Sequence, residues 1–204
     1  MSVVKSKIGI MGGTFDPIHI GHLVTAEAVR IEYLLDKVIF IPAANPPHKQ
    51  DQQVTPAMHR YIMTVMATNS NPYFFVSDIE LERPGLSYTV DTVTRLIGRF
   101  GAQTDFYCIT GADAIQELPT WEKVHELLEL CHFIAATRPG CNSTLDDVIT
   151  HFGLQGRKRI HRLATPELEI SSTDIRDRVK NGLSIKYIVP ESVETYILKE
   201  GLYR

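Results

Sequence analysis

Two histidines follow a pair of glycines near the start of the sequence, in residues 12–22 (GGTFDPIHIGH). On the first turn of a helix, His19 and His22 would project from nearly the same face. Each imidazole can donate a hydrogen bond to a phosphate, and a protonated imidazole adds positive charge. The glycines allow main-chain amides to approach an anion closely. The segment predicts a phosphate-binding turn, although the glycine pair alone is typical of many turns, and the histidine pair alone also fits half a metal site.

A second candidate anion site lies in residues 170–176 (ISSTDIR). Serine and threonine are favoured at the start of a helix, where hydroxyls and free amides can hold phosphate oxygens. Arg176 lies one turn further on, where a guanidinium can reach the same anion. Taken alone, the segment is more typical of a capped helix with a solvent-facing arginine.

The first segment is neither a GxGxxG dinucleotide fingerprint nor a GK[ST] phosphate loop. It contains the pattern HxGH, in which it resembles the nucleotidyltransferase superfamily of Rossmann-like adenylyl- and cytidylyltransferases. Within that resemblance, residues 170–176 look like the second half of the superfamily's triphosphate clamp. The two segments are far apart in the sequence, so their joint occurrence by chance is improbable.

The middle of the chain narrows the resemblance. The motifs PPHK (46–49), RPGLSYTVDT (83–92), GAD (111–113) with LPTW (118–121), and RPG (138–140) each follow a predicted strand. Together with the first and last segments, they resemble the bacterial nicotinate-nucleotide adenylyltransferases over nearly the whole chain. These motifs are far more specific than HxGH.

The resemblance implies transfer of AMP from ATP to nicotinate mononucleotide, giving deamido-NAD and pyrophosphate, with Mg²⁺ held mainly by the ATP phosphates and by no protein ligand. The implied ATP site is Gly12, Gly13, Thr14, Phe15, His19, His22, Gly111, Asp113, Arg138, Ser172, Thr173 and Arg176. The implied mononucleotide site is Asn45, Lys49, Thr89, Trp121 and Glu122. His19, His22, Lys49 and Arg176 would be the catalytic residues. Trp121 would stack on the pyridine ring, and the amides of Thr89 and Glu122 would receive the nicotinate carboxylate.

Several of these residues also have simpler interpretations. Trp121 is typical of a core or surface anchor, Lys49 of an exposed loop tip, and Thr89 and Asp113 of helix caps. The family often has an aromatic residue where this chain has Glu122. Its carboxylate would repel an acidic substrate unless the side chain points away.

Short apolar runs alternate with helical patterns along the whole sequence. Strands are expected at 7–11, 38–41, 73–79, 105–110, 131–137 and 159–163. Helices are expected at 22–35, 56–68, 89–100, 145–152, 171–180 and 190–200, with a helical stretch from the loop at Gly111 to residue 130. Uninterrupted apolar strands indicate a sheet buried on both faces. We therefore predict an α/β fold, a Rossmann-like parallel sheet with helices on both faces and a small C-terminal helical extension from about residue 170. Residues 1–204 are expected to form a single domain.

Composition excludes several classes of protein. The chain has 204 residues, a formal net charge of −3 and three cysteines without CxxC spacing. A slightly negative net charge is not typical of a nucleic-acid-binding protein. The cysteines indicate neither a zinc site nor a disulfide framework. No apolar run approaches the length that spans a membrane. We expect a cytoplasmic protein with small-molecule substrates and no nucleic-acid or membrane partner; a homo-oligomer is left open.

Three rival functions are weighed against this one. Phosphopantetheine adenylyltransferase shares HxGH and the Ser-Ser-Thr…Arg loop, but it does not call for PPHK or a tryptophan at 121. A regulatory module that binds nucleotide without turnover would be expected to lack some phosphate ligands, yet all four charged or imidazole candidates are present. A dehydrogenase is disfavoured because the GxGxxG pattern is missing.

Overall fold

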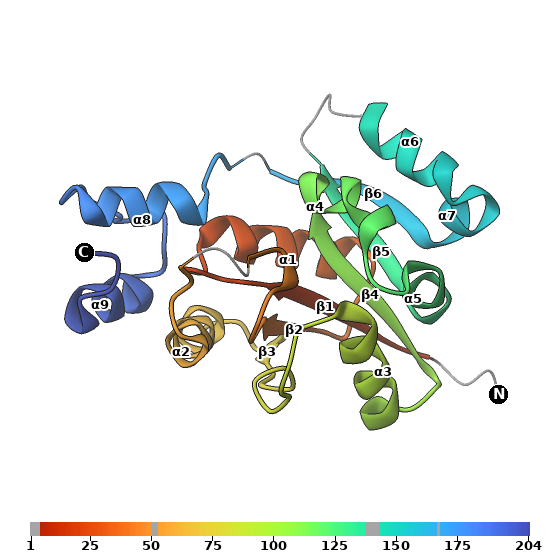
Figure 1. Ribbon diagram of the computed structural model, residues 1–204, viewed down its shortest axis with the longest axis horizontal. Coiled ribbons are helices and arrows are strands. Elements are labelled where there is room, and N and C mark those ends of the chain that lie inside the picture. The colour runs from red at the N-terminus through yellow and green to blue at the C-terminus, as the bar shows by residue number, and fades with distance from the viewer. Residues whose placement is uncertain (1–4, 50–52, 138–142, 167) are drawn as a thin grey trace.

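In a computed structural model, which describes residues 5–49, 53–137, 143–166 and 168–204, the chain forms a six-stranded parallel sheet (Figure 1). The strand order is β3-β2-β1-β4-β5-β6, and each neighbouring pair is parallel. The strands are β1 (Ser6–Gly13), β2 (Lys37–Pro42), β3 (Phe74–Val76), β4 (Thr104–Gly111), β5 (His132–Thr137) and β6 (Ile160–Ala164). This confirms the predicted parallel sheet, of which β3 and β6 are the edge strands.

Successive residues of each inner strand face opposite sides of the sheet. Ile39 and Ile41 of β2 belong to one buried cluster, whereas Val38 and Phe40 belong to the other. The same alternation divides the apolar residues of β1, β4 and β5 between the two clusters. A strand with apolar neighbours above and below has no polar face, which is why these runs are continuous in the sequence.

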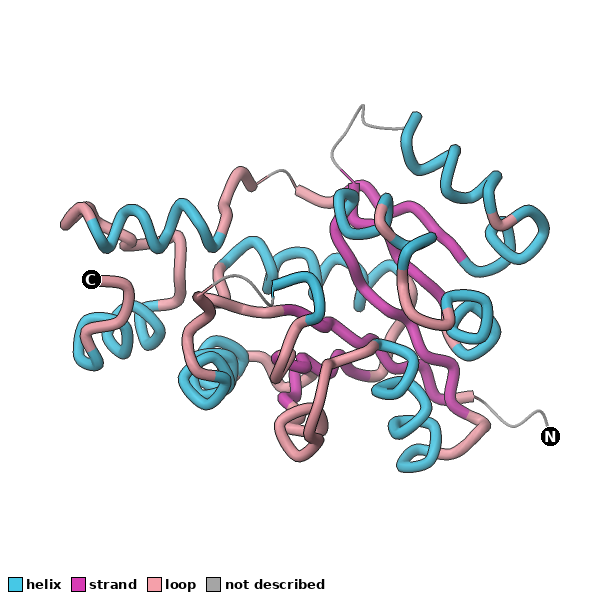
Figure 2. Tube along the Cα trace, viewed as in Figure 1, coloured by secondary structure: helices cyan, strands magenta, loops and turns pink. Residues whose placement is uncertain are grey.

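Helices cover both faces, as Figure 2 shows by separating helices, strands and loops. One cluster is closed by α3 (Thr89–Phe100), α5 (Val124–Leu130) and α6 (Ser143–His151). The other is closed by α1 (Ile20–Glu32), α2 (Ala57–Thr68), α8 (Ser172–Lys180) and α9 (Glu191–Glu200). Helices α8 and α9 form the predicted C-terminal extension, at the left of Figure 1. None of the helices in the described ranges is long and apolar enough to cross a membrane.

Two stretches differ from the sequence expectation. The expected helical stretch up to residue 130 is wrong as a continuous element, because it divides into α4 (Ala112–Gln116), a 3-10 turn (Leu118–Thr120) and α5. Lys123, with a φ of 50°, lies in the left-handed region before α5 and separates it from the turn. Helix α7 (Gly153–Arg159) was not predicted. It packs closely on α6. Gly156 permits this close approach, because any side chain there would collide with the carbonyl oxygen of Ile149.

Candidate active site

The strand order places a topological switch point between β1 and β4. From β1 the chain moves outward through β2 to β3 and then returns to β4 on the other side of β1. The loops that follow β1 and β4 therefore leave the sheet in opposite directions and open a crevice where ligands bind in such folds. Gly13 ends β1 and Gly111 ends β4, so both candidate glycines border this crevice.

The turn after β1 is shaped by Phe15. Its φ is 50°, and its ring is buried beside Gly13, where an added Cβ would lie 3.0 Å from the ring. The Phe15 ring also meets the His22 ring edge to face, at 5.1 Å between centroids. Phe15 is thus a packing residue that holds the turn and one imidazole in place. Gly12 lies in open space, with no atom within 4 Å of an added Cβ.

The two imidazoles lie face to face, with ring centroids 3.7 Å apart. His19 is extended and immediately precedes α1, and His22 lies in the helix's first turn. The main-chain N–H of His19 donates to Nδ1 of His22 at 3.2 Å. A neutral His22 must therefore carry its proton on Nε2, which leaves that atom as a donor for a ligand.

Both histidines are neutral at pH 7 in this structure. Burial lowers the pKa of His19 to about 4, and burial together with the His19 charge lowers the pKa of His22 well below its usual range. The expectation that a protonated imidazole adds positive charge is therefore corrected: the imidazoles supply hydrogen bonds, not charge. Within the described chain the buried Nδ1 of His19 has no hydrogen-bond partner.

Gly21 accommodates the His19 ring. A Cβ at residue 21 would lie 3.1 Å from both Cε1 and Nδ1 of His19, and 4.0 Å from Cβ of Ile170. The glycine of HxGH therefore makes room for the neighbouring imidazole of this chain.

The last candidate loop contacts the first directly. Ser172 donates its hydroxyl to the carbonyl oxygen of Pro17 at 2.9 Å, and Nη1 of Arg176 donates to the carbonyl oxygen of Asp16 at 2.8 Å. Nη2 of Arg176 donates to the Thr173 hydroxyl at 3.2 Å. Both hydroxyls expected to hold phosphate are thus engaged within the protein. The first-turn amide of Asp174 already donates to the Ser171 hydroxyl at 3.1 Å, and the amides of Ser172 and Thr173 are directed out of the N-terminus of α8.

Two further cations approach the same loops. Lys49 ends the 3-10 turn Pro47–Lys49, and burial followed by the positive charge of Arg176 lowers its pKa. Arg60 is 1% exposed. It donates to the carbonyl oxygens of Thr55 (2.8 Å), Thr14 (2.7 Å) and Ala44 (3.2 Å). It therefore ties the turn after β1 to the loop after β2.

Arg60 and Asp16 received no role from the sequence. The buried positions of α2 include Arg60, Met63, Thr64 and Ala67, which recur at helical spacing. An arginine on that face was the available signal for Arg60, because a buried guanidinium needs acceptors. Asp16 lies within the first motif and is 3% exposed, but nothing in its spacing distinguished it from a turn residue.

A cavity of about 550 Å³ lies between the loop after β2 and the loop after β3. Asn45 and Lys49 line it together with Arg60, Gly85 and Leu86. Asn45 joins the two loops, since its side-chain amide donates to the carbonyl oxygen of Gly85 at 3.0 Å. The volume is in the range of small-molecule sites. Two of the candidate mononucleotide residues, Asn45 and Lys49, are therefore brought together. Lys49 is also one of the cations, with Arg60 and Arg176, near the turn after β1.

The remaining described candidate residues do not line this cavity. Thr89 is the first residue of α3, so its N–H has no acceptor within the helix and can donate to a ligand. Trp121 is partly buried against the cluster under α3, with its ring 5.9 Å from that of Phe133, and Glu122 is exposed. Trp121 thus packs on the core with one part of its surface and leaves another part exposed. Arg138 and the side chain of Asp113 lie outside the described part of the chain.

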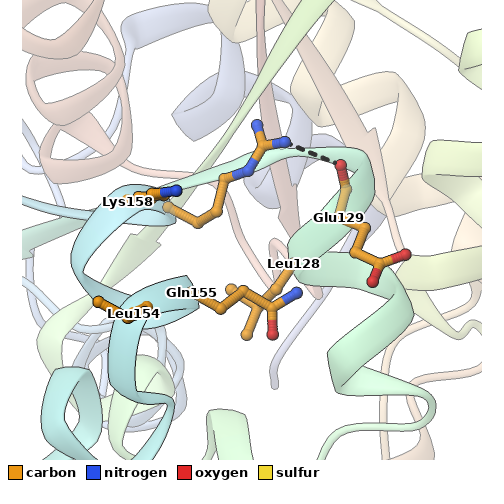
Figure 3. Close-up of a pocket in the computed structure, with 6 residues that line it drawn as sticks. Leu128, Glu129, Leu154, Gln155 and Lys158 are labelled. Atoms are coloured by element: carbon orange, nitrogen blue, oxygen red, sulfur yellow. Dashed lines mark hydrogen bonds between the residues drawn. The ribbon is translucent and has the colours of Figure 1, made fainter.

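A second cavity, of about 300 Å³, lies between α5 and α7. Leu128 and Glu129 line it from one helix, and Leu154, Gln155 and Lys158 from the other (Figure 3). Both helices lead directly into the starts of β5 and β6, so this cavity lies at the end of the sheet opposite to the candidate loops. It contains none of the predicted site residues.

Comparisons with known proteins agree with this geometry. A family model described as cytidylyltransferase-like matches residues 10–178. A probable nicotinate-nucleotide adenylyltransferase of Moorella thermoacetica is 58% identical over 97% of this chain and 92% of its own length. One from Thermoanaerobacter sp. is 54% identical over 97% and 94%.

Solved structures share the fold. Plasmodium falciparum nicotinic acid mononucleotide adenylyltransferase, solved in complex with NaAD, superposes with a TM-score of 0.78 at 21% identity, covering 97% of each chain. The crevice, the paired imidazoles and the arginine that contacts the same turn accordingly lie in a fold of known kind. By the extent of the family model and by its near-full-length relatives, this chain belongs to the cytidylyltransferase-like family, among the nicotinate-nucleotide adenylyltransferases.

Proposed function

We propose that this chain transfers AMP from ATP to nicotinate mononucleotide, giving deamido-NAD (nicotinate adenine dinucleotide) and pyrophosphate. The observation that carries the proposal is the contact of Arg176 with the carbonyl oxygen of Asp16, which brings the last loop to the turn bearing His19 and His22. The family to which the chain belongs supports the same reaction.

The reaction is an in-line attack of the mononucleotide phosphate on the α-phosphorus of ATP. The attacking oxygen is already anionic at neutral pH, so no general base is required. Catalysis then comes from alignment and from stabilising charge on the departing pyrophosphate. His22 donates through Nε2 and Arg176 supplies charge to the ATP phosphates, with His19 beside them. Lys49 positions the attacking phosphate.

We assign the cavity beside Asn45 and Lys49 to the mononucleotide phosphate. The pyridine ring of the mononucleotide extends toward Trp121 and stacks on the exposed part of the indole. The nicotinate carboxylate accepts hydrogen bonds from the amides of Thr89 and Glu122. Gly12, Gly13, Thr14, Ser172 and Thr173 surround the ATP phosphates, and Phe15 belongs to this site through the turn that its buried ring supports. Gly111, Asp113 and Arg138 border the adenosine. The side chain of Glu122 is exposed, which is compatible with a direction away from the acid.

The donor groups of the site suit a metal that arrives with its substrate. No group of three or more His, Cys, Asp or Glu side chains among the described residues could hold an ion. Both carboxylate oxygens of Asp16 already accept hydrogen bonds, from Thr55 and Tyr203. We therefore propose that Mg²⁺ is held by ATP phosphate oxygens and water, where it neutralises phosphate charge. We further propose a single domain over residues 1–204, a cytoplasmic location, and small-molecule substrates with no nucleic-acid or membrane partner.

Pyrophosphate release tests the proposal directly. The purified protein is incubated with ATP and Mg²⁺ plus nicotinate mononucleotide, nicotinamide mononucleotide or phosphopantetheine in parallel. We expect the highest kcat/KM with the acid mononucleotide and deamido-NAD as the product. Faster turnover of phosphopantetheine, or ATP binding without turnover of any acceptor, would overturn the proposed reaction.

A further inference from the structure

The Asp16 carboxylate joins parts of the chain that are distant in sequence. Its Oδ2 accepts the main-chain N–H of Thr55 at 3.2 Å, and its Oδ1 accepts the hydroxyl of Tyr203 at 2.7 Å. Its carbonyl oxygen accepts Arg176. Three residues after Asp16 the chain reaches His19, so the position of this one residue affects both the imidazoles and the arginine.

Tyr203 follows α9 and is held in a defined conformation. Its φ is 65°, and its ring packs against the cluster under α1, α2, α8 and α9. Burial, and then the negative charge of Asp16, raise the pKa of Tyr203. The phenol is therefore protonated at neutral pH and donates to the carboxylate. A hydrogen bond to a charged acceptor is among the stronger kinds.

The Asp16 charge acts on the cations of the site. Burial lowers the pKa of Lys49 and of Arg60, and the negative charge of Asp16 partly offsets this lowering. A carboxylate left free to rotate would also release the Thr55 N–H, at the start of the segment that leads into α2. The Tyr203 hydroxyl is therefore in a position to fix both the direction of this charge and the path of two substrate loops.

We infer that Tyr203 is a positioning residue for adenylyl transfer, acting through Asp16 on the turn that carries His19 and on the loop that carries Lys49. The inference rests on the proposed function for its kinetic measurement, but not for its structural one. The competing interpretation is that the phenol only anchors α9.

A matched pair of variants separates the two interpretations. Tyr203→Phe removes the hydroxyl and keeps the ring. Tyr196→Phe removes a hydroxyl from α9 itself, where it bonds Nδ1 of His59 at 2.8 Å, and so tests anchoring of the helix alone. For each variant we would measure the melting temperature, kcat, the KM for each substrate, and hydrogen exchange of the Thr55 amide.

We expect Tyr203→Phe to lower kcat about tenfold, and to speed exchange at Thr55 by a similar factor, as for loss of one hydrogen bond to a charged group. Tyr196→Phe should lower the melting temperature while leaving kcat and Thr55 exchange as in the wild type. Unchanged Thr55 exchange or a kcat within twofold of wild type in Tyr203→Phe would overturn the inference, and so would an equal loss of kcat in Tyr196→Phe. If the wild-type protein makes no dinucleotide, the proposed function fails while the exchange measurement still decides the role of Tyr203.

Discussion

His22 combines a fixed tautomer with a low pKa. The His19 amide occupies its Nδ1, and burial keeps the ring neutral. A neutral donor held in place before substrate arrives costs no reorganisation when charge develops on the leaving group. The positive charge of the site comes from Lys49, Arg60 and Arg176 instead.

Removing this donor should affect the chemical step more than the fold. We expect His22→Ala to lower kcat by about 10²–10³, as for the loss of one transition-state hydrogen-bond donor. Steady-state kinetics of pyrophosphate release measures the change. The control is His125→Ala, which truncates an exposed histidine on α5 and should leave kcat unchanged. A His22→Ala kcat within twofold of wild type would refute the role of the imidazole.

Residues that carry a motif were predictable, and residues that only support it were not. His19, His22 and Arg176 came from strings whose residue types and spacing fit a phosphate, and Asn45 and Lys49 came from the family resemblance; all five lie in loops or helix starts at one edge of the sheet. The roles of Asp16, Arg60 and Tyr203 depend on contacts across long stretches of sequence, such as the bond between Tyr203 and Asp16. No local pattern encodes such a contact.

Among the elements, the first turn of α1 has little freedom to change. His19 lies over Gly21, so an alanine there would place a methyl group against a buried ring. In an ordinary helix the same substitution stabilises, because alanine loses less conformational entropy than glycine. The two effects can be separated by measuring activity and stability on the same variant.

We expect Gly21→Ala to lower kcat about tenfold by displacing the imidazole, because catalytic geometry tolerates only small shifts. Gly98→Ala is the matched control, since an added Cβ within α3 meets no atom within 4 Å. It should raise the free energy of unfolding by about 0.5–1 kcal/mol and leave kcat unchanged. Kinetics and urea denaturation measure the two quantities. A Gly21→Ala enzyme as active as wild type would show that the ring moves without consequence.

Element types were more predictable than element boundaries. Helix α3 has the predicted limits, and the apolar strands were recognised because both of their faces are buried. The break of the 112–130 stretch depends on the left-handed conformation of Lys123. A lysine in the sequence gives no sign of this conformation. Helix α7 is polar except for Leu154, so its sequence lacks the apolar periodicity that identifies a helix.

On the scale of the whole molecule, buried neutral histidines make stability depend on pH. The pKa of His19 is about 4 when folded against an ordinary value of 6.5, and that of His132 is also lowered to about 4, mainly by burial. Between these values the unfolded chain binds more protons than the folded chain, so stability falls as the pH is lowered from 6.5 toward 4.

For His19 alone, the loss of unfolding free energy between pH 7.5 and pH 5 is about 2 kcal/mol. Urea denaturation at pH 7.5 and pH 5 measures it. We expect His19→Asn to lose less stability than wild type over this interval, because asparagine takes up no proton. Gly98→Ala, which retains every histidine, should show the wild-type loss. Equal losses in wild type and His19→Asn would contradict the assignment.

The contacts of Ser172 and Arg176 with the turn after β1 span 155 and 160 residues. During synthesis, the sheet and the imidazole pair leave the ribosome before α8 exists. A nascent polypeptide that ends at β6 accordingly lacks both the arginine that contacts Asp16 and the apolar residues of α8 and α9 that complete one buried cluster. The site is therefore completed late in translation, by the same segment that closes this side of the core.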